Sequence, residues 1–302
     1  MKSIVILNPY AKRWEALARR PEAEDALNQA GVKFEIVQTE QPGHGVELAA
    51  QAVRDGYQKI IAAGGDSTIN EVVNGIMAAT SDVKDTPLFG VLPMGTANDL
   101  VYNLGIPTDL NLAAELIAGG QPKNIDVCQV NDRYFVNNSG VGLEPYITTI
   151  QMQIQRVQGI VRYLLATMIG IYRKPEWDMD IIWDAGNFQG PATLVSVGNS
   201  PRTGGLFFLT PHADAFDGKL TFIIGYAPTR FQLLQLLPKA MRPAQGNVSE
   251  DRRVMEAHTQ SIRLTLDHPS PVHADGEIFS ETITELEYRI FPSRLPILLP
   301  EG

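Results

Sequence analysis

Two glycine-rich runs carry the residue types that bind phosphate. The first is AAGGDSTINEVVNG at residues 62–75, and the second is PMGTANDL at residues 93–100. Glycine lets the backbone approach a ligand, hydroxyl groups donate hydrogen bonds, and a helix start offers unpaired N–H groups and partial positive charge. Each run also holds an acid, Asp66 or Asp99, which would repel phosphate unless a divalent cation lay between them. Together the runs predict a phosphate site that uses Mg²⁺.

A simpler interpretation exists for the first run alone: Asp66 or Ser67 caps a helix after a glycine turn. The same arrangement follows a neighbouring apolar segment, which chance capping produces less often. The runs contain neither the G-x-x-x-x-G-K-S/T phosphate loop nor the G-x-G-x-x-G dinucleotide fingerprint. The sequence therefore favours a phosphate site of another kind.

The elements that position these runs are readable in the first third of the chain. Compact apolar segments predict strands at 3–7, 32–36, 59–63 and 87–92. Helical patterns lie between them: one opens at Pro21, one covers 45–54, and one follows the first glycine run, with Ile69, Val72, Val73, Ile76 and Met77 on its buried face. This alternation predicts an α/β domain, with a parallel sheet and helices on both faces. Ligands of such sheets bind beyond the carboxyl ends of the strands, where both runs lie.

The second half of the chain has a different pattern. Segments with alternating apolar residues dominate from residue 124, and turn signals separate many of them. This pattern predicts an antiparallel β-sandwich, interrupted by helices near residues 157–172 and 230–241. The predicted domains are 1–123 and 124–291.

Composition excludes several classes of protein. The chain has 302 residues, of which 44% are hydrophobic and 20% charged, as in globular proteins. Its net charge of −9 argues against nucleic acid as a main partner. The chain has a single cysteine, Cys128, so no disulfide can form within it, as in cytoplasmic proteins. Its place in a predicted strand indicates a position in the core. No signal peptide is recognisable, and no window reaches the roughly 18 apolar residues of a membrane span.

The paired runs resemble the diacylglycerol kinase catalytic family, in its soluble bacterial lipid-kinase branch. The likeness continues along most of the chain, through Asn8-Pro9, Thr39 before PGHG, Ile125-Asp126, residues 137–142, TGGLFFLTPHADAFDGKL and HADGE. NAD kinases and phosphofructokinases are more distantly similar, since they share the GGD turn. The resemblance implies transfer of the γ-phosphoryl group of ATP to a lipid hydroxyl, with ATP between the domains. It makes 1–123 the nucleotide-binding domain and 124–291 the lipid-binding domain that carries the catalytic base. Residues 292–302 would return to the first domain.

The resemblance also implies roles for particular residues. The ATP contacts that it implies are Asn8, Thr39, Gly64, Gly65, Asp66, Ser67, Thr68, Ile69, Asn70, Glu71, Gly95, Thr96 and Asn98. The catalytic base that it implies is Glu277 of the DGE motif, and the acids that organise the catalytic Mg²⁺ are Asp66, Asp99 and Asp126. A second, structural Mg²⁺ site matches Asp214, Asp217 and Lys219, the outer two through backbone carbonyls.

Taken by themselves, the residues around Glu277 leave two interpretations open. Asp275-Gly276 is a common hairpin turn signal, and a plain turn explains it. Phosphoryl transfer to an alcohol needs a group that takes the hydroxyl proton, and a positioned carboxylate suffices. Asp217-Gly218 has the same ambiguity, because a turn and a hard-cation site would use the same residues.

Two positions depart from the family pattern. GGDST replaces the usual GGDGT, so Ser67 would be strained if that position required positive φ. The first loop reads NPYAK and lacks the usual glycine. Two other functions therefore stay open: an NAD kinase that acts on a soluble nucleotide, and a non-catalytic protein that binds ATP as a sensor.

The lipid partner implies transient association with a membrane surface. Basic residues near the 157–172 helix could meet anionic headgroups, although a solvated helix face is the commoner explanation; they are Arg156, Arg162, Arg173 and Lys174. Residues 206–209 fit either a lip for acyl chains or an ordinary buried segment. The sequence fixes neither the lipid nor its chain length, and it leaves both a monomer and a homodimer open.

Overall fold

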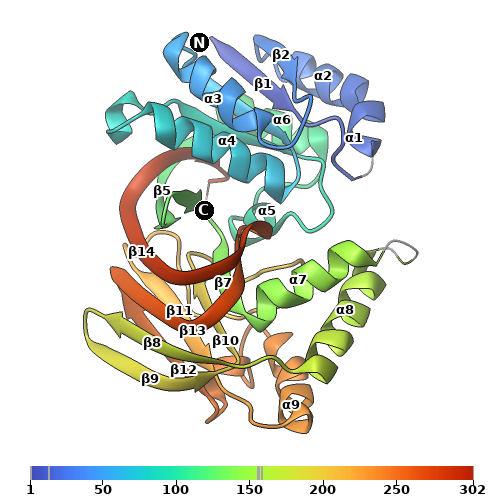
Figure 1. The fold of residues 1–302 in the computed structure, drawn as a ribbon. Helices are drawn as coiled ribbons and strands as arrows, with labels where there is room; N and C mark the ends of the chain where they lie inside the picture. Colours follow the sequence, from blue (N-terminus) through green and yellow to red (C-terminus); the bar gives the residue numbers. More distant parts are fainter. Residues whose placement is uncertain (1, 13, 155–156, 158, 302) are drawn as a thin grey trace. The chain divides into compact units, whose positions relative to one another are not determined.

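The computed structural model describes residues 2–12, 14–154, 157 and 159–301. The chain divides into two compact units, Met1–Val127 with Pro292–Gly302, and Cys128–Phe291. In Figure 1 the first unit runs from blue to green and takes up the red end of the chain, and the second runs from green to orange. The chain first crosses between units after residue 127, whereas the sequence prediction put this crossing at residue 123.

The first unit is built on a parallel sheet. Its strands are β1 (Ser3–Leu7), β2 (Phe34–Gln38), β3 (Lys59–Gly64) and β4 (Leu88–Pro93), in the order β4-β3-β1-β2. The end of β14 (Glu277–Leu299) runs parallel to β4, with Ile297 opposite Phe89. Consecutive buried residues in β1 and β3 follow from helices that cover both faces. The strand order reverses between β1 and β3, which is where such sheets bind ligands.

Helices cover the two faces of this sheet in pairs. On one face α2 (Arg20–Gln29) packs against α6 (Leu110–Gly119), and on the other α3 (His44–Arg54) packs against α4 (Asp66–Ala79) (Figure 1). Gly75 permits the α3–α4 contact, because a Cβ there would lie 2.3 Å from the Val46 carbonyl oxygen. The short helices are α1 (Glu15–Ala18), η1 (Val83–Asp85) and α5 (Asp99–Asn103).

The second unit is antiparallel. Its strands are β6 (Arg133–Phe135), β7 (Asn138–Gly142), β8 (Trp177–Trp183), β9 (Gly186–Ala192), β10 (Leu194–Gly198), β11 (Leu220–Gly225), β12 (Val254–Thr259) and β13 (Ser261–Ala274), with parts of β5 (Gln121–Val130) and β14. Strand β13 bends at register shifts between Thr265 and His273, so its first half pairs with β8 and its end pairs with β7. One strand thus joins both layers of a sandwich. Cys128 lies in its core, as predicted.

Three helices complete the second unit: α7 (Leu143–Gln153), α8 (Gly159–Arg173) and α9 (Arg230–Ala240), with the short η2 (Val248–Glu250). Helix α8 packs against α7 and contacts α9. The predicted fold class, an α/β domain followed by an antiparallel β-sandwich, is confirmed. In the part of the chain that the structure describes, none of the helices has the length and apolar character needed to span a bilayer.

Candidate functional site

The two glycine turns of the first unit touch each other. Strands β3 and β4 are neighbours, with Gly64 opposite Pro93, so the turns that follow them lie side by side. A Cβ built on Gly95 would lie 2.4 Å from the Gly65 Cα, and one built on Gly65 would lie 3.0 Å from the Gly95 Cα. The backbones approach too closely for any side chain, which explains why both positions are glycine.

The carboxylate of Asp66 ties these turns together. Its Oδ1 accepts hydrogen bonds from the backbone N–H of Asp99 at 2.7 Å and of Leu100 at 3.4 Å. Asp66 therefore caps α5 rather than its own helix, α4, whose N-cap is Gly65. Burial raises the pKa of Asp66, and the backbone N–H donors oppose that rise. A cation beside this carboxylate would favour its ionised form.

Two buried polar atoms at the same turns have no hydrogen-bond partner among the described residues: Thr68 Oγ1 and Asn98 Oδ1. Thr68 stands over Gly64, where a Cβ would lie 2.2 Å from its Oγ1. Leaving a buried polar atom unsatisfied costs about 1–3 kcal/mol. The hydroxyl group suits a phosphate oxygen, and the amide oxygen suits a cation or its water, so these residues fit a phosphate group with a divalent ion.

Asn8 and Thr39 end the neighbouring strands at the same edge of the sheet. The backbone N–H of Asn8 donates to the Ala63 carbonyl, and that of Thr39 donates to the Leu7 carbonyl. Ser67 lies inside α4 and is absent from the described residues with positive φ. The strain considered for serine in place of glycine at this position is therefore not found.

Three predicted ATP contacts in α4 face protein groups. Ile69 is buried, and Asn70 accepts hydrogen bonds from the Asn74 amide. Glu71 binds the backbone N–H of Gly43 at 2.8 Å and of Gly45 at 2.9 Å, which anchors the start of α3. Their role as ATP contacts stays a prediction, as does that of the exposed Thr96.

The predicted acids separate into two groups. Asp99 is buried at the start of α5, and its backbone N–H donates a hydrogen bond to the Asp66 carboxylate. Asp126 is fully buried in β5, and its Oδ1 accepts a hydrogen bond from the Ser293 N–H at 2.6 Å. The structure brings Asp66 and Asp99 together, whereas Asp126 fastens the returning C-terminal segment.

The DGE motif of the second unit forms a two-residue hairpin turn. Ala274 pairs with Glu277, and Asp275 and Gly276 have φ of +49° and +83°. The Asp275 carboxylate accepts three backbone N–H bonds at 2.8–3.1 Å, from Val136, Asn137 and Asn138. The Asp275-Gly276 turn agrees with the hairpin signal in the sequence, whereas no sequence signal indicated the contacts of the Asp275 carboxylate. Glu277 is exposed as the first residue of β14, on a firmly held turn.

A buried hydrogen bond between a histidine and a carboxylate lies next to this turn. His273 Nδ1 accepts the Gly276 N–H at 3.2 Å, and its Nε2 lies 3.2 Å from Glu144 Oε1. Burial opposes ionisation of Glu144, but His273, together with Asn138 and other donors, keeps its pKa below the usual value. Gly140 makes room, because a Cβ there would lie 2.5 Å from Glu144 Oε2. The pair holds the turn, and no sequence motif indicated it.

The predicted structural Mg²⁺ loop folds on itself. Asp214 Oδ1 accepts the Phe216 N–H at 3.0 Å, Asp217 Oδ1 accepts the Lys219 N–H at 2.9 Å, and the Asp217 N–H reaches the Asp214 carbonyl at 3.4 Å. In the described ranges no cluster of three or more His, Cys, Asp or Glu side chains is placed to hold a metal. Mg²⁺ at this loop would need backbone carbonyls, and it stays a proposal.

The second unit also contains an apolar cavity with an empty volume of about 740 Å³, including its mouth. Helices α7, α8 and α9 form much of its wall, with Leu143, Ile147, Tyr163, Ile171, Leu233 and Leu236 among the lining residues. Phe207 and Leu209 of the predicted acyl segment also line it. Among the described lining residues, Glu144 is the one acid. A cavity of this apolar character suits an aliphatic chain.

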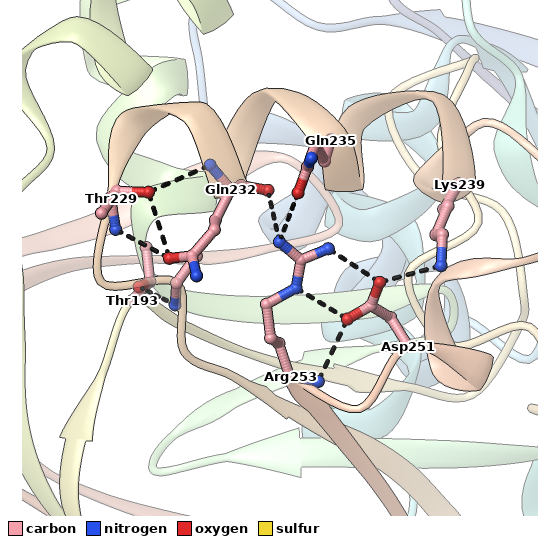
Figure 2. Close-up of polar contacts among 8 residues, drawn as sticks. Thr193, Thr229, Gln232, Gln235, Lys239, Asp251 and Arg253 are labelled. Atoms are coloured by element: carbon pink, nitrogen blue, oxygen red, sulfur yellow. Dashed lines mark hydrogen bonds and ion pairs between the residues drawn. The ribbon is translucent and has the colours of Figure 1, made fainter.

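A network of charged side chains holds helix α9, which forms part of the cavity wall. Figure 2 shows Asp251 between Lys239 and Arg253, at 2.8 Å and 2.7 Å. Arg253 also donates to the Gln232 carbonyl and the Gln235 side chain. Arg253, and less strongly Lys239, hold the pKa of Asp251 well below its usual range. Asp251 therefore keeps its charge in the neutral pH range.

Family models match both units of the chain. The diacylglycerol kinase catalytic domain matches residues 2–130, and the YegS C-terminal NAD kinase beta sandwich-like domain matches residues 138–299. The chain belongs to the diacylglycerol kinase catalytic family. It is accordingly a kinase.

Individual relatives agree with this family. The kinase is 29% identical over 274 residues to diacylglycerol kinases of Staphylococcus aureus strains MRSA252 and JH9, which covers 90% of this chain and 85% of each relative. Its fold matches the crystal structure of a diacylglycerol kinase from Bacillus anthracis str. Sterne with a TM-score of 0.77 and 22% identity, over 99% of this chain and 96% of that one.

Proposed function

We propose that this kinase transfers the γ-phosphoryl group of ATP to the hydroxyl group of a lipid such as diacylglycerol. The observation that carries the proposal is the apolar lining of the cavity in the unit that holds the DGE turn. An acyl chain would fill such a cavity, whereas the phosphates and sugars of NAD would lose their hydration there without compensation. The cavity therefore favours a lipid over a soluble nucleotide as the acceptor.

The glycine turns would bind the triphosphate. The Thr68 hydroxyl and the N–H groups that begin α4 donate to phosphate oxygens, and Gly65 and Gly95 let the backbone come close. When bound, Mg²⁺ shields the phosphate charge from Asp66 and Asp99. Two carboxylates suffice for an ion that keeps several of its waters. Asp126 would order those waters, as the resemblance implies.

Glu277 would accept the proton of the lipid hydroxyl as the phosphoryl group transfers. A carboxylate can take the proton of an alcohol, and Glu277 is exposed on a turn that Asp275 and His273 anchor. Asp275 and His273 would not contact the substrate. They act as positioning residues, because their hydrogen bonds hold the turn that carries Glu277.

Incubation of the protein with labelled ATP, Mg²⁺ and separate acceptors tests the proposal. The acceptors are diacylglycerol, phosphatidylglycerol, a sphingoid base, a polyprenol and NAD. We expect label in the organic extract with at least one lipid and none on NAD. Label on NAD alone would replace the proposal with an NAD kinase. ATP binding without transfer to any acceptor would replace it with an ATP sensor.

A further inference from the structure

Helix α8 exposes an apolar stripe to solvent. Val161, Leu165, Met168 and Tyr172 follow at intervals of four, three and four residues, which places them on one helical face. All four are exposed, Tyr172 to 72%. The same helix lines the apolar cavity with Tyr163, Thr167 and Ile171. A surface helix that faces only water is usually apolar on its protein side alone, whereas α8 is apolar on both sides.

Helix α9 and its C-cap continue this apolar surface. Phe231 is 69% exposed, and Leu234 and Met241 are also exposed, while Leu233 and Leu236 line the cavity. Arg230 joins the two helices, because its Nε donates to the Tyr172 carbonyl and its guanidinium lies 5.0 Å from the centre of the Tyr172 ring. In Figure 1 α8 and α9 lie together at one end of the second unit.

The charge of this surface is opposite to that of the chain as a whole. The chain has 34 acidic and 25 basic residues, yet residues 159–174 and 230–242 contain no acid. The basic residues in these two segments are Arg162, Arg173, Lys174, Arg230, Lys239 and Arg242. Lys174 and Lys239 form ion pairs with Glu176 and Asp251, so the arginines supply the positive charge of the surface. Arg156, which the sequence grouped with them, lies outside the described residues. Apolar side chains bordered by basic ones match a bilayer with anionic lipids.

We infer that the exposed faces of α8 and α9 form a docking surface for a bilayer that contains anionic phospholipids. This inference rests on the proposed function, in which the lipid acceptor must leave a bilayer to enter the cavity. The two helices that would enter the headgroup region are the helices that wall the cavity, so docking brings the cavity wall to the acceptor. Leu165, Met168 and Phe231 insert among the headgroups, and Arg173 and Arg242 meet their phosphates.

Co-sedimentation with vesicles tests the docking surface. One set of vesicles contains phosphatidylcholine alone, and the other contains phosphatidylcholine with phosphatidylglycerol. We expect the wild type to bind the mixed vesicles, and added salt to weaken that binding. The double variant Leu165→Glu, Phe231→Glu should bind roughly a hundredfold more weakly, since each large apolar side chain withdrawn from the bilayer costs about tenfold.

The matched control is Leu112→Glu with Ile182→Glu. Both control residues are 52% exposed and lie on α6 and β8, so this variant carries the same charge change on surfaces that the inference does not use. It should bind mixed vesicles as the wild type does, apart from the small effect of net charge. Neither pair of residues lines the cavity, so phosphorylation of a dissolved short-chain diacylglycerol should be the same in both double variants.

Three results would overturn the docking surface: no binding of mixed vesicles by the wild type, equal binding by the two double variants, or a solution dimer that only the α8–α9 variant dissociates. The last would make a second copy of the chain the occupant. If the wild type phosphorylates no lipid but binds vesicles through this surface, the proposed function fails and the docking surface stands.

Discussion

Replacing Glu277 by glutamine is expected to lower the rate of phosphoryl transfer by about 10²–10⁴-fold, the usual contribution of a general base. Glutamine keeps the shape of the side chain but cannot take the proton of the acceptor hydroxyl. Because Glu277 is exposed, the change should alter the free energy of unfolding by no more than about 0.5 kcal/mol. Initial rates with labelled ATP measure the first effect and denaturant unfolding measures the second, while ATP titrations follow nucleotide binding.

Glu281→Gln provides the matched control, since Glu281 is an exposed glutamate on the same strand, β14. It should retain the wild-type rate. A Glu277→Gln enzyme that transfers phosphate as fast as Glu281→Gln would remove Glu277 from the chemistry. A Glu277→Gln enzyme that also loses ATP binding would show that the substitution acts on nucleotide binding rather than on proton transfer.

Replacing Gly95 by alanine is expected to weaken ATP binding by at least about tenfold and to destabilise the protein by about 1–3 kcal/mol. The new Cβ would lie 2.4 Å from the Gly65 Cα and 2.5 Å from Asn98 Oδ1. Because the first of these is a backbone atom, the two turns must separate. Separation also strains the hydrogen bond from Asp99 N–H to Asp66. Calorimetric titration and thermal unfolding measure the two losses.

Gly119→Ala is the control for this substitution. A Cβ on Gly119 meets nothing within 4 Å, and its φ is not positive. Alanine there, near the end of α6, should leave ATP binding unchanged and stability equal or slightly higher. If Gly95→Ala binds ATP as tightly as Gly119→Ala does, the contact between the turns does not shape the phosphate site.

The α/β unit could be predicted closely from the sequence. Strands such as 3–7 and 59–63 are buried on both faces, so they appear as short continuous apolar runs, and Asn8-Pro9 and Gly64 mark where they end. The residues that bind phosphate follow from the same logic, because the topology of a parallel sheet collects its strand ends at one edge. Asp66, Asp99 and the two glycines could therefore be grouped before their distances were known.

The supports of the second unit could not be predicted in this way. Asp275 binds backbone groups at residues 136–138, and Glu144 binds His273, so each depends on a partner more than a hundred residues away. Helix α7 contains a proline and four β-branched residues, which weaken its helical pattern, and packing against α8 stabilises it instead. Glu71 shows the same limit, since a motif residue proved to anchor another helix.

The central claim is that the turns around Asp66 and Asp99 accept a triphosphate only with a divalent cation between them. Calorimetric titration of ATP into the protein, in excess Mg²⁺ and again in excess EDTA, tests it most directly. We expect chelation to weaken ATP binding by at least about tenfold, because uncompensated carboxylates would face the phosphates. ATP that binds with equal affinity under both conditions would contradict the account.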